Sequence, residues 1–583
     1  MSKYTADFET STYEWYKIDK LARVWAFAIC EIENPNNVII GNNIEDFIKF
    51  CKKSRENPEI WFHNLKFDGE YIFYYLLSNN YKYIKDKKDR CDNSFTCLIS
   101  DVGQFYTIEI YFKVNKKKVN KVTIKDSMKL LNFSVDTIAD KFNLPLKKLT
   151  LDYNTYRLIN HELTSHEIEY IKADVVIMAM ALKIMFDEGL NRLTIASNAM
   201  YSFKKLIPYM SDYYPVLSYK IDEVCRLSYK GGWTYLNPIY KNKLINKGLV
   251  IDANSMHPSQ MYYKLLPFGQ PLHFENKYKY DICYPLYIQE LTCSFKLKKN
   301  KLPCIQLKKT IGFNDTEYIE TTNGEYVTLC LTSVDLELFF MQYDVDILCY
   351  NGGYKFKGVK GLFCNYIDKW MNEKNKAKKD DNMALYQISK LMLNSLYGKF
   401  GLNPNVRGKF PYLKDDESVG YHLTEKEIRD SIYVPVASFI TAYSRYNIIT
   451  TSQKIRDYTL EKYNKDYYIY SDTDSIHMLD IDYEELKNII DIDNYRLGAY
   501  KLESTFIKAK FLKSKCYIEV DSNNNLNTTV AGLPKKLGKY LNLENFKIGF
   551  SITADEEDKE HKLRFMHVKG GVILVDTDFT IKS

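Results

Sequence analysis

The first part of the chain, to about residue 190, alternates short apolar strands with longer helical stretches, and this order restricts the fold more than any other feature. Apolar runs such as Val24 to Ile29 and Trp61 to His63 predict strands, and Ser165 to Phe186 predicts a helix. Strands that alternate with helices predict an α/β domain. With 583 residues, the chain has room for further domains, since one domain usually takes about 100 to 200 residues.

Composition excludes several classes of protein. A hydrophobic fraction of 45% with 27% charged residues is typical of a folded globular chain. No apolar run reaches the roughly 18 residues that a membrane-spanning helix needs, and the first ten residues lack the apolar stretch of a secretory signal. Twelve cysteines without a Cys-x-x-Cys pair predict neither a zinc site nor a disulfide framework. We therefore expect no membrane partner and a cytoplasmic location.

Charge and aromatic content leave the function open. The net charge of +7 permits a polyanionic partner without requiring one. Fifty tyrosines would suit base stacking. However, an excess of Lys, Asn, Ile and Tyr is also what AT-rich coding produces.

Two acidic residues lie two positions apart near the N-terminus. On a strand, Asp7 and Glu9 would project from one face, and their mutual repulsion favours a divalent cation between them. A solvated strand edge would explain this pair if it stood alone. Asp68 follows a predicted strand, however, and Tyr170 and Asp174 lie four apart on one face of a predicted helix. The five residues together indicate a metal site.

A second set of carboxylates lies in the C-terminal half. Asp252 ends an apolar strand and is followed by Ser255, a residue type that begins helices. Asp472 and Asp474 alternate so that both are expected on one face at the tip of a hairpin. An Asp-x-Asp pair also occurs in metal-dependent sugar transferases, which are the rival interpretation at this point.

A helical segment between these carboxylates separates the two interpretations. Lys390, Asn394 and Tyr397 fall at positions i, i+4 and i+7, on one helix face. A lysine suits a triphosphate and a tyrosine can cover a nascent base pair, whereas a nucleotide-sugar enzyme has no need of this helix. A packed amphipathic helix would explain the spacing but not the polar Asn394 and Ser395.

In order and type, these residues resemble the motifs of two known families. Motifs Exo I, Exo II and Exo III of DEDDy-type 3′–5′ proofreading exonucleases are matched by Asp7, Glu9, Asp68, Tyr170 and Asp174. Motifs A, B and C of family B DNA polymerases are matched by Asp252-x-x-Ser255, by Lys390-x-x-x-Asn394-Ser395-x-Tyr397-Gly398 and by Tyr470-x-Asp472-Thr473-Asp474. Two further motifs occur in the protein-primed polymerases of tailed phages, namely Tyr229-Lys-Gly231-Gly232 and Lys515-Cys-Tyr517. The resemblance covers nearly the whole chain.

The resemblance implies an RNase H-like α/β exonuclease domain followed by an α+β right-hand polymerase with palm, fingers and thumb. It also implies two terminal-protein-region insertions. The implied boundaries are residues 1–190 for the exonuclease domain, 191–263 and 426–529 for the two parts of the palm, 264–355 and 400–425 for the first and second insertions, 356–399 for the fingers and 530–583 for the thumb.

The same resemblance implies a function and its partners. The chain is expected to be a template-directed DNA polymerase that replicates viral DNA by protein-primed initiation, strand displacement and processive elongation, with 3′–5′ proofreading. Its expected partners are primer–template DNA, dNTPs and a terminal protein that forms a heterodimer with it. Its expected location is the cytoplasm of an infected bacterial host. Two Mg²⁺ ions are expected at each active site, and Mn²⁺ is expected to substitute for them.

Individual roles also follow from the resemblance. The expected metal ligands are Asp7, Glu9, Asp68 and Asp174 in the exonuclease and Asp252 and Asp474 in the polymerase, with Asp472 supporting the polymerase site and Tyr170 orienting the attacking water. The expected nucleotide-binding residues are Ser255, His257, Lys378, Lys390, Asn394 and Tyr397. The expected DNA-binding residues are Tyr229, Gly231, Gly232, Lys515, Tyr517 and Lys148.

The sequence departs from the family pattern at two places. His257 stands where the family has a tyrosine beneath the sugar of the incoming nucleotide, so the discrimination against ribonucleotides rests on an imidazole. In the fingers, counting back from Lys390 favours Lys378 as the triphosphate lysine, whereas counting forward from Trp370 favours Lys374.

Two rival functions stay open at this level. A metal-dependent 3′–5′ exonuclease with a non-synthesising C-terminal region would keep the first carboxylate set but has no need of an intact Lys390 helix. A DNA-binding protein without activity has no reason to keep both carboxylate sets.

Overall fold

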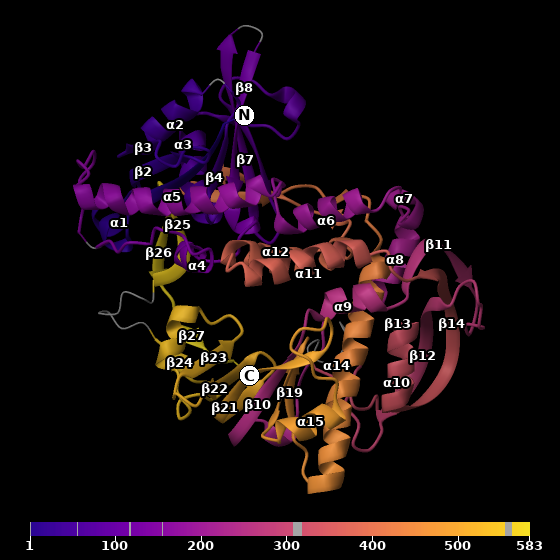
Figure 1. Cartoon of the computed structure of the whole chain (residues 1–583). Coiled ribbons are helices and arrows are strands. Elements are labelled where there is room, and N and C mark those ends of the chain that lie inside the picture. Colours follow the sequence, from indigo (N-terminus) through magenta and orange to yellow (C-terminus); the bar gives the residue numbers. More distant parts are fainter. Residues whose placement is uncertain are drawn as a thin grey trace.

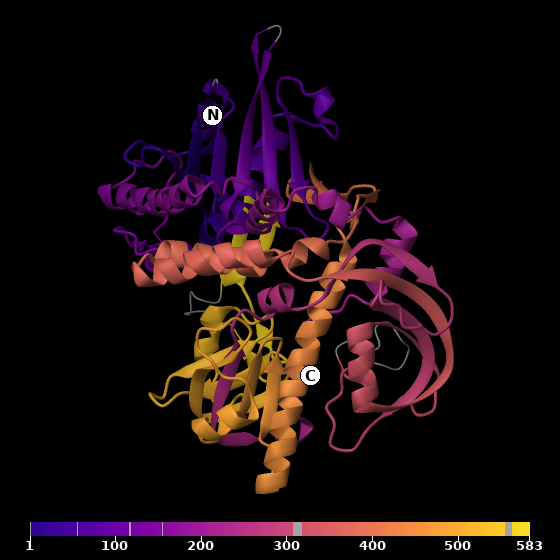
Figure 2. The ribbon, with the colours of Figure 1, turned by 45° about the vertical axis from the view of Figure 1, so that its right-hand side comes forward.

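The computed structural model describes residues 2–54, 56–115, 118–153, 155–306, 317–553 and 562–582. Two sheets lie one above the other in Figure 1, and the helices α11 (Cys364–Lys379) and α12 (Met383–Ser395) run between them. The same arrangement is visible after a 45° turn in Figure 2. Within the described residues, no helix combines the length and apolar character needed to cross a bilayer.

An eight-stranded mixed sheet forms the N-terminal region, with the strand order β3-β2-β1-β4-β8-β7-β6-β5. Its strands are β1 Lys3–Thr10, β2 Val24–Glu31, β3 Val38–Gly41, β4 Glu59–Phe62, β5 Lys82–Tyr83, β6 Ser94–Ile99, β7 Phe105–Asn115 and β8 Lys118–Asp126. Its helices include α1 Tyr13–Asp19, α2 Ile44–Lys53, α3 Leu65–Ser78, α4 Val135–Lys141 and α5 Ser165–Asp187. The predicted strands and the long predicted helix of the α/β region are confirmed.

Alternate residues of β1 face opposite layers of this region, because successive strand residues point to opposite sides of a sheet. Ala6 and Phe8 belong to the apolar core that also contains α2 and α3. Asp7 and Glu9 therefore face the other layer, which α5 covers. The expected common face of the two acids is confirmed.

A seven-stranded antiparallel sheet forms the second large layer, in the order β23-β22-β21-β10-β20-β19-β9. Its strands are β9 Thr234–Leu236, β10 Leu244–Ala253, β19 Tyr468–Asp472, β20 Ser475–Leu479, β21 Tyr500–Lys513, β22 Cys516–Val520 and β23 Leu526–Val530. The 30-residue helix α14 (Val434–Tyr463) contributes Ile448 and Ile455 to an apolar core with Ile251 of β10. The helix α14 therefore packs against the sheet close to the edge at which β10 and β19 end.

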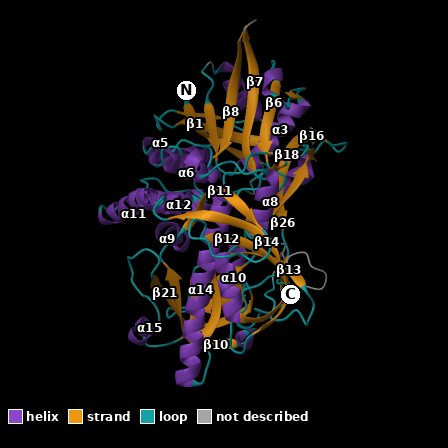
Figure 3. Ribbon diagram, turned by 90° about the vertical axis from the view of Figure 1, so that its right-hand side faces the viewer, coloured by secondary structure: helices purple, strands orange, loops and turns teal. Residues whose placement is uncertain are grey.

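Smaller elements extend from these two layers, as the view coloured by secondary structure in Figure 3 shows. A four-stranded sheet, β11-β14-β12-β13, packs on α10 around a core of its own. Its elements are β11 Leu266–Phe274, β12 Leu286–Leu297, β13 Val327–Thr332, α10 Ser333–Gln342 and β14 Tyr343–Val359. Two short antiparallel pairs follow α12, namely β15 (Asn405–Val406) with β18 (Glu427–Ile428) and β16 (Lys409–Leu413) with β17 (Val419–Leu423).

A C-terminal ribbon of two strands, β25 (Lys562–Val568) and β26 (Gly571–Asp576), returns to the N-terminal region. Val572 and Ile573 are fully buried in the core that contains α3. The hydroxyl of Tyr71 donates to the Val572 carbonyl at 2.5 Å. Segments from the two ends of the sequence therefore share one core.

Two candidate carboxylate sites

The N-terminal candidate site lies between β1 and α5. Asp7, Glu9 and Asp174 place one carboxylate oxygen each within 4.8 Å of one another. Glu9 and Asp174 are only 6% and 4% exposed, and Asp68 is 3% exposed. Three of the five residues predicted for this site therefore converge, and Asp68 lies close enough for Asp7 and Glu9 to raise its pKa.

A sharp turn from β4 into α3 places Asp68. Asn64 has φ 73°, in the left-handed region that asparagine tolerates better than most residues. The carboxylate of Asp126 accepts hydrogen bonds from the amides of Asn64 at 3.1 Å and Leu65 at 3.3 Å. Because this turn starts the helix at once, Asp68 lies in the first turn of α3 and joins the acids of β1.

Electrostatics show that these acids need a cation. Burial and then the charge of Asp174 raise the pKa of Asp7 to about 7. Burial and then Asp7 raise the pKa values of Glu9 and Asp68. Buried Oδ1 atoms of Asp68 and Asp174 have no hydrogen-bond partner among the described residues. The converging carboxylates of Asp7, Glu9 and Asp174 fit Mg²⁺, a cation that binds oxygen ligands.

A lysine and two tyrosines complete this site. The ammonium of Lys148 lies 2.7 Å from Oδ2 of Asp174 and 5.7 Å from the centre of the Tyr170 ring. The Tyr170 hydroxyl lies 2.5 Å from that of Tyr153. The structure therefore places Lys148 and Tyr170 with the carboxylates, and it adds Tyr153, which motif matching did not single out.

The second candidate site lies where β10 and β19 end. Thr473 has φ 63° and turns the chain between β19 and β20. Asp474 lies in this turn rather than on a strand, as its amide donates to the Asp472 carbonyl at 2.7 Å. The Asp474 carbonyl accepts from the Ala253 amide at 2.9 Å, next to Asp252. The expected hairpin is present, with Asp472 at the end of β19 and Asp474 in its tight turn beside Asp252.

The three aspartates of this site differ in their surroundings. Burial and then Asp474 raise the pKa of Asp252 to about 7, and burial and then Asp472 raise the pKa of Asp474 to about 6. The carboxylate of Asp472 instead accepts hydrogen bonds from Thr234 at 3.1 Å and Tyr470 at 3.4 Å. Asp252 and Asp474 therefore fit a cation, whereas the protein itself satisfies Asp472.

Lysines line the second site. Lys501 lies 3.8 Å from Oδ2 of Asp252, and Lys515 lies 3.7 Å from Oδ1 of Asp472. Lys390 is close enough to lower the pKa values of Asp252 and Asp474, against the raising effect of burial. A polyanion would be attracted to this side of the sheet.

The Tyr229-Lys-Gly-Gly segment packs directly on the turn of the second site. A Cβ atom at Gly232 would lie 2.5 Å from Oγ1 of Thr473, so only glycine permits this approach. The guanidinium of Arg445 donates to the carbonyls of Lys230 and Gly231, both at 2.8 Å. The Tyr229 ring lies against Gly401, which precedes the short strand pairs.

His257 has a defined hydrogen-bonding state. Its Nδ1 lies 2.9 Å from the hydroxyl of Ser444, and its ring centre lies 4.1 Å from that of Tyr397. The Ser444 hydroxyl donates its one hydrogen bond to the Ile440 carbonyl at 2.9 Å, so its oxygen accepts a hydrogen bond from Nδ1–H of His257. Burial and then Arg445 lower the pKa of His257 to about 4. The imidazole is therefore neutral, with its proton on Nδ1 and an acceptor lone pair on Nε2.

The helical face that carries Lys390 is nearly continuous. α12 ends at Ser395, and Tyr397 begins the short helix α13 (Tyr397–Phe400). Leu396 between them keeps helical angles of φ −73° and ψ −48°. Lys390, Asn394 and Tyr397 therefore keep their predicted common face across the junction.

The structure distinguishes the two lysines considered for the fingers. Lys374 is half-buried, and burial followed by the charges of Lys501 and Lys390 lowers its pKa. Lys378 is exposed, with its ammonium 5.8 Å from the centre of the Tyr495 ring. The surroundings favour Lys374, which is the choice given by counting forward from Trp370.

Two other predicted residues, Ser255 and Tyr517, lie next to the acids and lysines of the second site. Ser255 has φ 54° and begins α9 (Met256–Tyr263) beside Asp252. Tyr517 packs between Phe511 and Tyr470, with ring centres 5.0 and 5.3 Å away. The Tyr517 ring is thus part of an aromatic core next to Lys515.

Several residues of these sites were missed by sequence reasoning. The examples are Tyr153, Thr234, Ser444, Lys501 and Glu503. Only Lys501 and Glu503 form a pattern that the sequence could have shown, since they are two charged residues that alternate on β21, the strand paired with that of Asp252. The hydroxyl residues form none, because serine, threonine and tyrosine are common in loops and helices without a role in a site.

Comparisons with known proteins identify the family of this chain. The sequence model of the family described as DNA polymerase type B, organellar and viral, matches residues 51–492. The DNA polymerase of Bacillus phage Nf is 40% identical over 99% of both chains, and that of Streptococcus phage Cp-1 is 31% identical over 100% of this chain and 98% of the relative. The solved complex of phi29 DNA polymerase with primer–template DNA and incoming nucleotides superposes with a TM-score of 0.90, at 38% identity over the whole of both chains. The chain therefore belongs to the organellar and viral type B DNA polymerases.

Proposed function

We propose that this chain is a template-directed DNA polymerase with 3′–5′ exonuclease activity, which starts viral DNA replication on a terminal protein and then elongates by strand displacement. Likeness over the full length to phage DNA polymerases supports this function. The relatives include a polymerase solved with primer–template DNA and incoming nucleotides. Primer–template DNA and dNTPs are accordingly the proposed substrates.

One observation carries the proposal, namely that the chain has two separate carboxylate sites of different character. The first is closed, with its acids at most 6% exposed except for the half-buried Asp7. The second is partly open, with the Asp252 side chain 23% exposed and lysines around it. A closed acidic site suits hydrolysis of a single strand end, and an open site beside lysines suits a triphosphate.

For synthesis, Asp252 and Asp474 would hold Mg²⁺. Asp472 would fix the turn that carries Asp474. The bound ions would stabilise the charge that develops on the phosphate oxygens. Lys390, with Lys374 or Lys378, would bind the triphosphate oxygens, and Tyr397, Asn394 and Ser255 would line the nucleotide site. His257 would lie beneath the sugar, held by Ser444. The α-phosphate would then face the 3′-hydroxyl of the primer.

For proofreading, Asp7, Glu9, Asp68 and Asp174 would hold the cations. Lys148, paired with Asp174, would contact the scissile phosphate. The hydroxyl of Tyr170 would orient the attacking water. Mg²⁺ is the proposed ion at both sites, two at each, with Mn²⁺ as a substitute.

The domain layout is also a proposal. The proposed boundaries are those expected from the sequence. The four-stranded sheet β11–β14, from Leu266 to Val359, spans the range 264–355 that was expected for the first insertion. The pairs β15–β18 and β16–β17 lie where the second was expected at 400–425 and continue to Ile428. The first insertion would bind the terminal protein in a heterodimer. Tyr229, Gly231, Gly232, Lys515 and Tyr517 would contact the DNA. The proposed place of action is the cytoplasm of an infected bacterium.

The experiment is extension of a labelled primer–template in Mg²⁺, with and without dNTPs, by the intact chain and by Asp474→Ala. Loss of extension in the variant, with 3′ degradation kept in both proteins when dNTPs are absent, is the expected result. Degradation without extension by the intact chain would instead support an exonuclease with a non-synthesising C-terminal region. If the intact chain neither extended nor degraded primed DNA, the result would support a DNA-binding protein without activity.

A further inference from the structure

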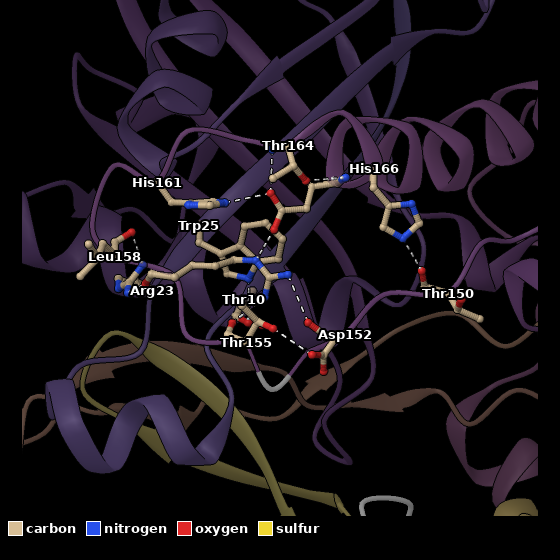
Figure 4. Close-up of polar contacts among 12 residues, drawn as sticks. Thr10, Arg23, Trp25, Thr150, Asp152, Thr155, Leu158, His161, Thr164 and His166 are labelled. Atoms are coloured by element: carbon tan, nitrogen blue, oxygen red, sulfur yellow. Dashed lines mark hydrogen bonds and ion pairs between the residues drawn. The ribbon is translucent and has the colours of Figure 1, made fainter.

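One buried arginine connects three parts of the proposed exonuclease site. Arg157 is 4% exposed and lies in the segment between α4 and α5, which also carries Lys148 and Tyr153. Its guanidinium lies over the Trp25 ring, 4.1 Å from the ring centre. Figure 4 shows Trp25 at the centre of this group, with Thr10, Asp152, His161 and Thr164 around it.

The first connection is to the loop of Tyr153. The guanidinium of Arg157 donates from Nη2 to the Asp152 carbonyl at 3.1 Å and from Nη1 to the Thr155 carbonyl at 2.9 Å. These carbonyls lie on either side of Tyr153 in the sequence. The arginine therefore fixes the backbone from which the Tyr153 side chain reaches the Tyr170 hydroxyl at 2.5 Å.

The second connection is to the helix of Tyr170. Nε of Arg157 donates to Oε1 of Glu167 at 2.5 Å. The other carboxylate oxygen of Glu167 accepts from the Thr164 amide at 2.9 Å and lies 2.8 Å from Nε2 of His161. Glu167 is the third residue of α5 and lies one turn before Tyr170. One guanidinium thus sets the positions of both tyrosines.

The third connection is to the strands of the carboxylates. Trp25 lies on β2, and its Nε1 donates to the Thr10 carbonyl at 3.2 Å. Thr10 is the last residue of β1, which carries Asp7 and Glu9. The positive charge of Arg157 also acts on Glu9, although burial and the neighbouring acids act on it more strongly.

This arrangement needs the shape of arginine. Three N–H groups point in three directions, toward Glu167, Asp152 and Thr155, while the flat face rests on Trp25. A lysine ammonium at the same place has no planar fork and no face to stack.

The tyrosine pair gives this placement a chemical purpose. Two phenol hydroxyls at 2.5 Å share one of their two protons, so the pair has one proton left to donate outward. Burial followed by the charge of Glu9 raises the pKa of both tyrosines, which keeps both phenols protonated. The direction of the remaining O–H then depends on the relative position of the two rings.

We propose that Arg157 is a positioning residue for proofreading, which sets Tyr153 against Tyr170 so that their free O–H points at the water or phosphate of the scissile bond. The inference rests on the proposed exonuclease function of this site. It assigns no contact between Arg157 and DNA.

The test compares Arg157→Lys with the intact chain for degradation of single-stranded DNA and for primer extension in Mg²⁺. We expect the exonuclease kcat to fall roughly 10- to 100-fold with KM changed less than about 3-fold, because misplaced catalytic groups cost rate rather than binding. Extension should stay within about 2-fold. Arg226→Lys is the matched control, since Arg226 also pairs with a buried acid, Asp222, and donates to the Gly401 carbonyl. It should leave the exonuclease unchanged.

A double-mutant cycle with Tyr153→Phe distinguishes positioning from general stability. If Arg157 acts through Tyr153, the tyrosine substitution will add little in the Arg157→Lys protein, because coupled residues are not additive. Equal effects of Tyr153→Phe in both backgrounds would overturn the proposal. So would a parallel fall of extension, exonuclease and Tm in Arg157→Lys. Absence of exonuclease activity in the intact chain would instead refute the proposed function.

Discussion

The two carboxylate sites use the same residue types in opposite surroundings. In the exonuclease site, Asp68, Glu9 and Asp174 are buried, and Oδ1 atoms of two of them have no partner among the described residues. In the polymerase site, the protein pairs Asp472 with hydroxyl groups, and Lys501 and Lys390 balance Asp252. The first site gathers several buried acids around one lysine, Lys148, whereas several lysines and hydroxyl groups face the three acids of the second site. We expect the two sites to respond differently to the same chemical change.

The largest effect should come from Asp174→Asn. This change removes a carboxylate of the closed site and the partner of Lys148, so exonuclease activity should fall about 10³-fold or more, as metal-dependent chemistry requires its ligands. Primer extension should stay within about 2-fold. Asp187→Asn is the control, because Asp187 lies on the same helix but pairs only with the half-exposed Lys183 near the surface. An equal loss of extension in Asp174→Asn would contradict the independence of the two sites.

The open site should depend on a specific lysine. Lys374→Ala should raise the KM for dNTPs roughly 10- to 100-fold, since Lys374 lies with Lys390 and Lys501 and supplies a charge-assisted contact to the triphosphate. Lys378→Ala, four residues along the same helix, should change this KM less than about 3-fold. Steady-state extension at varied dNTP concentration measures both values. The reverse order would assign the triphosphate contact to Lys378.

Sugar discrimination in the open site should depend on the hydrogen bond that holds His257. Ser444→Ala should lower the ratio of dNTP to rNTP efficiency about 3- to 10-fold, which corresponds to the loss of one hydrogen bond of about 1 kcal/mol. Thr441→Val is the control, because the Thr441 hydroxyl donates to the Ala437 and Ser438 carbonyls of the same helix. Single-nucleotide insertion with each sugar gives the ratio. An unchanged ratio would show that the imidazole needs no anchor.

Metal binding should stabilise the closed site more than the open one, in a pH-dependent way. Raised pKa values of about 7 for Asp7 and Asp252 mean that the metal-free folded protein binds extra protons. Their stabilising effect is present below about pH 4 and is lost as the pH rises through about 7. Mg²⁺ replaces these protons, so the Tm increase on adding Mg²⁺ should grow from pH 5 to pH 8, to about 2 to 4 °C.

The variants localise this stabilisation. Asp474→Asn should keep most of the Mg²⁺-dependent increase in Tm, and Asp174→Asn should lose most of it. The reason is that the closed site contains more carboxyl groups whose pKa is raised. Thermal unfolding with and without Mg²⁺ across this pH range provides the measurement. A Tm increase that is the same at pH 5 and pH 8 would contradict the pKa argument.

The sequence predicted those parts of the molecule that depend on local pattern. The period of two on β1 put Asp7 and Glu9 on one face, and the helical spacing joined Tyr170 to Asp174. The hairpin at Asp472 to Asp474 was also expected, but the left-handed conformation of Thr473 was not, because alternation does not predict the backbone angles of a turn. Arg157 and Ser444 were not found, since their importance comes from long-range packing. An arginine or a serine has no pattern until its partners are in place.

The C-terminal ribbon has a consequence for the order in which the protein is made. Val572 and Ile573 complete the apolar core around α3, although the strands of that core are synthesised first. During translation, domains generally fold as their sequence emerges, yet the N-terminal region lacks part of its interior until this ribbon leaves the ribosome. The N-terminal sheet therefore completes its core only after the second large sheet has been made, so a ribosome that stops early releases an N-terminal region whose core is still open.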